Sequence, residues 1–149
     1  MKEVLDFLKS SGTFYLATAE GDQPRVRPFG AVCEFDGKLY IVTNNQKNVY
    51  KQLLKNSKIE ISSTNGGKWL RLTAEAVQDT RREARVAMLE DNAASLSNMY
   101  NADDNLMVVF YLQNAKATIN SFTEDTSCLR FLTILLKVLV NSPNSSFDL

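Results

Sequence analysis

The chain has 149 residues, of which 17 are basic, 17 are acidic and none is histidine. This length fits one domain with a sizeable core, and the zero net charge argues against a nucleic-acid-binding protein, which usually has a basic excess. The absence of histidine excludes imidazole as general base and as metal or haem ligand, and with it Ser-His-Asp and Cys-His catalysis. We therefore expect no metal site.

The cysteines and the first residues indicate a cytoplasmic protein. Cys33 and Cys128 form no CxxC spacing, so neither suggests a zinc or redox motif. Residues 1–12 carry charges among their apolar positions, which is not typical of a signal peptide. We expect reduced thiols. Cys33 is either a reactive thiol or, as we favour, a small buried side chain in a strand.

The first part of the chain predicts one helix followed by strands. Apolar residues at helical spacing and a stop at Gly12 predict a helix over about residues 2–10. Pro28 removes one N–H from a predicted strand, so that side is expected to face a sheet edge or a bulge. Three strands are predicted here, the last two joined as a hairpin at Asp-Gly: 13–20, 25–35 and 38–43.

The next part predicts two helices and more strands. Apolar spacing predicts a helix at 46–56, and a Thr-x-x-Glu capping box at 80–83 predicts another that runs to about Glu90. A hairpin is expected at 65–67. Four strands are predicted around these elements: 58–64, 69–77, 105–112 and 117–122. Seven strands with short helices do not fit repeated βαβ units, so the sequence indicates a mainly β protein, an antiparallel barrel or sandwich.

The C-terminal residues are apolar and form no recognisable linker. We assign residues 1–126 to the main domain and 127–149 to an apolar C-terminal extension of it. The apolar run 128–140 is interrupted by Lys137 and is too short to span a bilayer. We expect it to bury itself on this domain or on a partner, and we expect no membrane association.

A group of lysines forms the candidate binding site. From Gly37 to Ile59 there are five lysines and no acidic residue. Asn44 or Asn45 is expected to cap the following helix, with free N–H groups and the positive end of its dipole facing outward.

Four basic residues are expected to converge beside that helix: Arg25, Arg27, Lys47 and Lys51. The lysines are four residues apart on a predicted helix, and the arginines are two apart on a strand, so each pair is expected to share a face. Hairpin pairing is expected to make Arg27 and Thr43 neighbours. This arrangement suits a phosphate group, although a solvated basic helix face is the alternative.

The stretch 21–62, GDQPRVRPFGAVCEFDGKLYIVTNNQKNVYKQLLKNSKIEIS, resembles the FMN-binding split barrel of the pyridoxamine 5'-phosphate oxidase-like proteins. GTFYLAT, RVRP, YIVTN and WLRLTAEAV follow one another as in that family over about residues 10–123. The most similar branch is that of the nitroimidazole-resistance (Nim-type) reductases. The resemblance implies an antiparallel split barrel, an FMN cofactor, and a homodimer with FMN at the subunit interface.

The resemblance also implies roles for particular residues. Arg27 would bind the phosphate, while Thr43 and Asn44 would bind the flavin ring edge and the ribityl chain. Trp69 would flank the isoalloxazine, or else be a core or interface aromatic residue. Without gaps, the family's phosphate-binding lysine aligns with Val49. The cofactor-binding residues expected are Arg25, Arg27, Pro28, Thr43, Asn44, Lys47, Lys51 and Trp69.

The expected function is that of an FMN-dependent oxidoreductase acting on a small molecule, with a nicotinamide as electron donor. The chain lacks the oxidase's Arg-Leu-x-Pro segment and the reactive histidine associated with Nim-type enzymes. No catalytic residue is assigned, and Tyr15, Tyr40 and Cys33 are candidates by chemistry alone. The alternatives are a non-catalytic flavin-binding or storage protein, and the same fold holding another anionic ligand such as haem.

Overall fold

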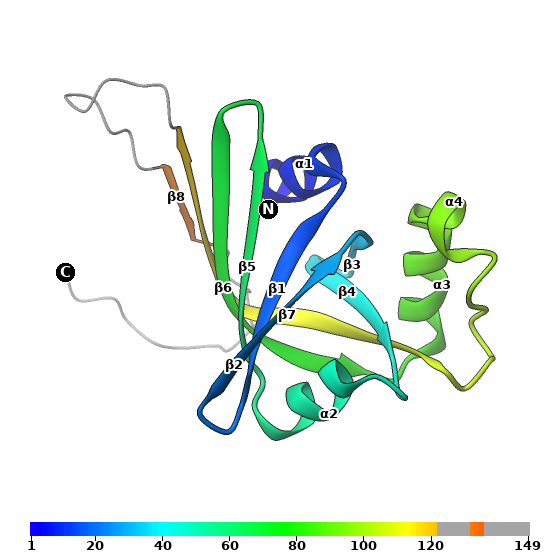
Figure 1. Cartoon of the computed structure of the whole chain (residues 1–149). Helices are drawn as coiled ribbons and strands as arrows, with labels where there is room; N and C mark the ends of the chain where they lie inside the picture. Colours follow the sequence, from blue (N-terminus) through cyan, green and yellow to red (C-terminus); the bar gives the residue numbers. More distant parts are fainter. Residues whose placement is uncertain (122–131, 136–149) are drawn as a thin grey trace, which may run out of the picture.

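The computed structural model describes residues 1–121 and 132–135. Strands dominate, and short helices lie around them (Figure 1). In chain order the elements are α1 (Lys2–Ser11), β1 (Phe14–Glu20), β2 (Gln23–Phe29), β3 (Val32–Phe35), β4 (Lys38–Asn44), α2 (Asn48–Lys55), β5 (Lys58–Asn65), β6 (Lys68–Asp79), α3 (Arg82–Asp91), α4 (Ala93–Leu96), β7 (Met107–Ser121) and β8 (Leu132–Leu135).

The strands form one antiparallel sheet in the order β2-β1-β5-β6-β7-β4-β3, with β8 paired to β7. The two end strands of this order, β2 and β3, are joined only by Gly30 and Ala31. An extended residue spans roughly 3.5 Å, so this link holds the two sheet edges close together. The sheet therefore curls into a barrel that is split between β2 and β3, which confirms the predicted mainly β, antiparallel split-barrel class.

The predicted strand 25–35 is wrong, because β2 and β3 are separate strands with different partners. β2 forms a hairpin with β1, in which Arg27 lies opposite Leu16. β3 forms the predicted hairpin with β4 across the turn at Asp36 and Gly37, both at positive φ. The expected pairing of Arg27 with Thr43 is therefore wrong. The expectation for Pro28 is confirmed, because β2 is an edge strand.

The two strands predicted at 105–112 and 117–122 form one long strand, β7. It accommodates Asn114 at positive φ (52°), next to the register shift at Thr73 and Glu75 of β6. A bulge of this kind lets a strand bend without ending, so the polar residues there do not form a turn.

The predicted helix caps are also wrong. Helix α2 begins at Asn48 after Lys47, and α3 begins at Arg82 after Arg81, and neither cap residue forms a side-chain capping hydrogen bond. The side chains of Asn44 and Asn45 bind other parts of the chain instead. Polar side chains of this kind can cap a helix or bind other groups, so the sequence pattern alone does not decide which they do.

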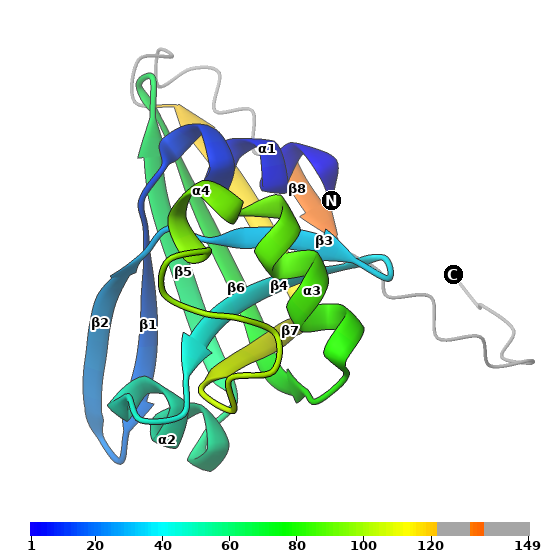
Figure 2. The same cartoon turned by 90° about the vertical axis from the view of Figure 1, so that its right-hand side faces the viewer.

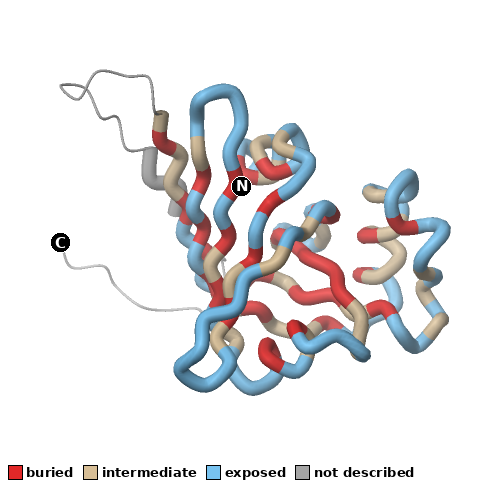
Figure 3. Tube along the Cα trace, viewed as in Figure 1, coloured by how far each residue is buried: buried red, intermediate tan, exposed pale blue. Residues whose placement is uncertain are grey.

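The barrel encloses one core, and a second lies between the sheet and α3. Alternate residues of β4 face the two cores, so five consecutive residues of this strand are buried (Figure 3). Leu39 and Ile41 point into the barrel, whereas Tyr40 and Val42 pack toward Met88 of α3. Helices α1 and α2 lie at opposite ends of the barrel (Figure 2).

The predicted extension 127–149 lies outside the described residues except for β8, whose backbone pairs with β7 from Lys116 to Ile119. Within residues 1–121 and 132–135, no helix is both long enough and apolar enough to cross a membrane.

Candidate functional site

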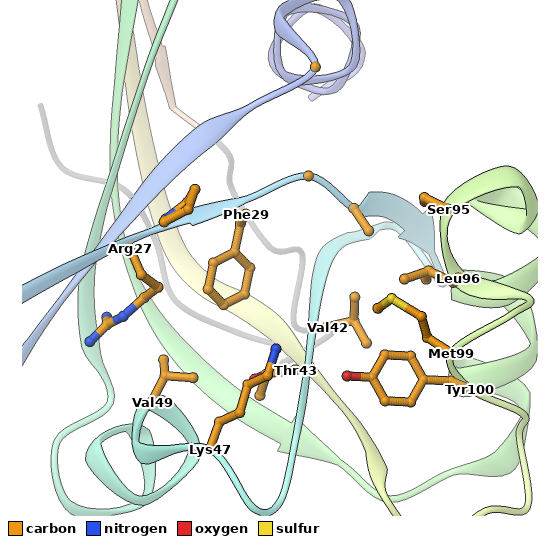
Figure 4. Close-up of a pocket in the computed structure, with 14 residues that line it drawn as sticks. Arg27, Phe29, Val42, Thr43, Lys47, Val49, Ser95, Leu96, Met99 and Tyr100 are labelled. Carbon is orange, nitrogen blue, oxygen red and sulfur yellow. The ribbon is translucent and has the colours of Figure 1, made fainter.

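A cavity of about 480 Å³ lies beside the split between β2 and β3. Its wall comes from the end of β2, the end of β4, the start of α2, and α4 with the residues that follow it (Figure 4). The lining residues are Gly12, Arg27, Pro28, Phe29, Gly30, Ala31, Val42, Thr43, Lys47, Val49, Ser95, Leu96, Met99 and Tyr100.

Arg27 is a half-buried cation without an acidic partner among the described residues. Its Nη1 donates to Thr18 Oγ1 (2.7 Å) and to the Leu16 carbonyl (3.2 Å), and its Nη2 donates to Gln52 Oε1 (2.7 Å). Three of its five N–H donors are used in this way, so two stay available for a ligand. Burial and the neighbouring Arg25 lower the pKa of Arg27, which still leaves the guanidinium charged at neutral pH.

Lys47 brings a second positive charge to the same side of the cavity. In Figure 4 its amino group points into the cavity, and Val49 lies between it and Arg27. Among the described residues Lys47 has no ion pair. Because Lys47 precedes α2 directly and Val49 is in its first turn, the positive end of this helix also borders the cavity.

Thr43 places an unsatisfied polar atom in the wall. Its side chain is buried, with 4% of the residue exposed, and its Oγ1 has no hydrogen-bond partner among the described residues. A buried hydroxyl without a partner costs free energy. Because Thr43 lines the cavity, a bound ligand is a natural partner for this oxygen.

The opposite side of the cavity is mainly apolar. Leu96, Met99 and Tyr100 face Arg27 and Lys47 across it (Figure 4). Asn44 Nδ2 donates to Tyr100 Oη (3.1 Å), which fastens this segment to the end of β4. The cavity therefore has a cationic end at β2 and α2 and an apolar end at α4 with one phenol.

The structure brings together only part of the predicted site. Arg27, Pro28, Thr43 and Lys47 line the cavity, and Asn44 adjoins it through Tyr100. Roles for these residues toward a cofactor stay predictions.

The other three predicted residues lie elsewhere. Arg25 is two residues nearer the β1–β2 turn and forms an ion pair with Glu20 (2.7 Å). Lys51 lines a separate pocket with Lys55, because Lys47 precedes the helix and the two lysines do not share a helical face. Trp69 is half-buried on β6 opposite Thr64 and does not line the cavity.

None of the three candidates by chemistry lines the cavity. Tyr15 is exposed, whereas Tyr40 is buried and donates to Asp79 (2.8 Å). Burial and this hydrogen bond raise the pKa of Tyr40 above its ordinary range. Cys33 is buried in β3, as favoured, and burial raises the pKa of its thiol to about 12. Such a thiol is a poor nucleophile at neutral pH.

Sequence reasoning missed Tyr100 and Gln52. Tyr100 lies in a polar stretch without periodicity, and only the fold brings it to the cavity. Gln52 did carry a signal, because it follows Val49 by three residues and therefore shares the buried face of α2. A glutamine on such a face needs partners, and here these are Thr18 and Arg27.

The fold and the cavity define a split-barrel protein whose cavity has a cationic end. The family model of pyridoxamine 5'-phosphate oxidase matches residues 1–120. A NimC/NimA family protein from Clostridium acetobutylicum is 50% identical, with 90% of this chain and 93% of that chain covered and a TM-score of 0.82. The chain belongs to the pyridoxamine 5'-phosphate oxidase family, in the NimC/NimA branch.

Two more distant structures share the fold. A pyridoxamine 5'-phosphate oxidase-related, FMN-binding protein from Nostoc punctiforme is 14% identical (89% of this chain, 93% of that chain, TM-score 0.59). HutZ, a heme storage protein from Vibrio cholerae, is 16% identical (75% and 87%, TM-score 0.60). Among curated proteins no match is found.

Proposed function

We propose that the protein binds FMN in this cavity and acts as an oxidoreductase on a small molecule, with a reduced nicotinamide as electron donor. The observation that carries the proposal is a cavity with two cations, Arg27 and Lys47, neither of which forms an ion pair with an acidic side chain among the described residues. The FMN-binding relative from Nostoc punctiforme supports a flavin on this fold.

The residues present fit the parts of FMN. The free N–H groups of Arg27, the Lys47 ammonium and the first turn of α2 suit the phosphate. The unpartnered Thr43 hydroxyl suits a polar atom of the ring or the ribityl chain. When bound, FMN supplies the electron transfer, and the side chains of the cavity bind it, orient it and exclude water.

Binding of FMN and of riboflavin, measured by flavin fluorescence, tests the phosphate assignment, because the two differ only by the phosphate group. Arg27→Ala removes a charge-assisted bond of about 1.5–3 kcal/mol, so FMN affinity should fall roughly tenfold to a hundredfold while riboflavin affinity stays unchanged.

Arg25→Ala is the matched control, since Arg25 is already paired with Glu20 and is expected to change FMN affinity less than threefold. Wild-type protein that binds FMN no better than riboflavin would contradict the phosphate site.

Catalysis is separated from flavin storage by anaerobic mixing of the FMN-loaded protein with reduced nicotinamide. Bleaching of the flavin absorbance is expected for an oxidoreductase, and unchanged absorbance favours storage or another donor. Haem is a second candidate ligand, because the neighbour from Vibrio cholerae is a heme storage protein. The chain has no histidine to bind haem iron, so we expect the purified protein to be yellow and not brown-red.

We also propose a homodimer formed through the exposed face of β1 and β2. Tyr15 and Val26 are 52% and 67% exposed on neighbouring strands at the edge of the sheet, and β2 itself forms part of the cavity wall. Exposed apolar side chains that cluster in this way favour association.

A further inference from the structure

We propose that the Tyr100 end of the cavity is a second subsite, which takes a neutral, flat and largely apolar molecule with one oxygen acceptor for a hydrogen bond. The inference rests on the proposed function, because it leaves the Arg27 end to the cofactor phosphate. The proposed ligand is the small molecule on which the loaded protein acts.

The walls of this subsite select for an apolar ligand. Val42 and Leu96 are buried, and Met99 lines the cavity although 58% of it is exposed, so it borders both the cavity and solvent. Methionine adapts its shape easily, and apolar pockets with a few polar groups are typical of small-molecule sites. In Figure 4 these side chains lie across the cavity from Arg27.

The hydrogen bonds of Asn44 determine what Tyr100 can do. Asn44 Oδ1 accepts from the Gln46 N–H (3.1 Å), which fixes the orientation of the amide and directs Nδ2 to Tyr100. The phenol oxygen is therefore the acceptor in the bond with Asn44, and its own hydrogen stays free. Among the described residues no acceptor takes this hydrogen, and Figure 4 shows the hydroxyl pointing into the cavity.

Thr43 adds a second polar group whose bonding capacity is unused. Its buried Oγ1 has no partner within residues 1–121 and 132–135, and it lines the same cavity. Because the proposed function gives this oxygen to the ring or the ribityl chain of FMN, Tyr100 is the polar group that remains for the second ligand in the loaded protein.

The charges of the cavity disfavour cationic and anionic ligands at the Tyr100 end. None of the fourteen described lining residues is acidic, so a cationic ligand finds no counter-ion in the cavity. An anionic group is drawn to Arg27 and Lys47 at the opposite end. A neutral molecule with an oxygen acceptor is what the Tyr100 end accommodates.

The test uses two probes that differ only by the acceptor, 1-indanone and indane, with equilibrium dialysis against FMN-loaded protein. The wild-type protein should bind 1-indanone more tightly than indane. Tyr100→Phe should weaken 1-indanone binding roughly threefold to tenfold, because one hydrogen bond is lost, and leave indane unchanged. The affinity for FMN should stay the same.

Two further variants serve as controls. Tyr50→Phe removes a phenol that lies 3.5 Å from Gln78 and does not line the cavity, so neither probe should bind differently. Met99→Ala removes apolar wall from an exposed position and should weaken both probes by a similar factor.

The subsite is refuted if the loaded wild-type protein binds neither probe, if Tyr100→Phe weakens both equally or neither, or if it weakens FMN instead. Failure of the proposed function is a distinct result, in which the wild-type protein binds no FMN. In that event the same titrations on the cofactor-free protein still decide whether Tyr100 donates to 1-indanone.

Discussion

Arg27 is the residue on which the proposed phosphate site depends, and its hydrogen bonds explain how a partly buried cation is held without an ion pair. Thr18 Oγ1 accepts from Arg27 and donates to Gln52 Oε1 (2.7 Å), which also accepts from Arg27. Thr18 and Gln52 are both 5% exposed. These neutral hydrogen-bond partners orient the guanidinium without forming an ion pair with it.

Replacing Gln52 by Glu tests whether the neutral partners of Arg27 matter for phosphate binding. The carboxylate keeps an acceptor in place and neutralises Arg27, so FMN affinity should fall about tenfold with riboflavin affinity within twofold of wild type. Gln23→Glu makes the same charge change at the exposed first residue of β2 and should have little effect. Equal losses for FMN and riboflavin would show that Gln52 supports the fold and not the phosphate end.

The elements around the site are held in place by polar side chains between them. Asn45 Nδ2 donates to the Asn105 carbonyl (2.7 Å), and Asn44 reaches Tyr100, so the turn before α2 is tied to the segment after α4. The two segments are far apart in sequence, and these hydrogen bonds hold them side by side around the cavity.

A second polar cluster joins α3 to the sheet. Asp79, at the end of β6, accepts hydrogen bonds from Tyr40 of β4 (2.8 Å) and from Arg81 before α3 (2.8 Å). Burial raises the pKa of Asp79, but hydrogen bonds from Arg81 and Tyr40 outweigh it, and the pKa is lowered to about 2. The charged carboxylate is therefore the form that stabilises the fold.

Asp79→Asn should lower the free energy of unfolding at pH 7 by an amount on the order of 2 kcal/mol. Because the folded pKa lies below the unfolded value, the contribution of Asp79 is complete above about pH 4 and is lost as the pH falls toward 2. Urea unfolding of the wild type and of Asp79→Asn between pH 5 and pH 2 measures this loss, because the free energies of unfolding of the two proteins should become equal at low pH.

Asp103→Asn is the control at this scale, since the ion pair of Asp103 with Arg82 is exposed and should contribute little to the free energy of unfolding. A difference between wild type and Asp79→Asn that stays constant with pH would contradict the assigned role.

At the scale of the whole molecule, the split between β2 and β3 determines where the cavity lies. The two-residue link at 30–31 holds the edge strands together, and the cavity lies beside it. The outer side of β1 and β2 carries the exposed Tyr15 and Val26. The proposed second subunit would cover these side chains.

Val26→Glu should convert the proposed dimer to a monomer, because it places a charge where an apolar side chain would be buried. Sedimentation velocity at micromolar concentration measures the state directly. Leu54→Glu makes an equivalent change at an exposed apolar residue of α2 and should leave the dimer intact. A wild-type protein that sediments as a monomer under these conditions would overturn the dimer.

Local pattern was sufficient for most elements and for the fold class. Strand alternation, apolar spacing and the Asp-Gly turn act between neighbours in the chain, so they predict β4, α2, β5 and the β3–β4 hairpin. The family resemblance also identified Arg27, Thr43 and Lys47, which meet at one cavity.

Long-range packing decided the rest. The sequence around Gly30 and Ala31 does not indicate that β2 pairs with β1 while β3 pairs with β4. Strand pairing depends on how the whole sheet closes and not on neighbouring residues in the chain. Arg25 forms an ion pair with Glu20, and Lys51 lines another pocket because α2 begins only after Lys47. The place of Tyr100 is set only in three dimensions, where β2, β4, α2 and α4 border the same cavity.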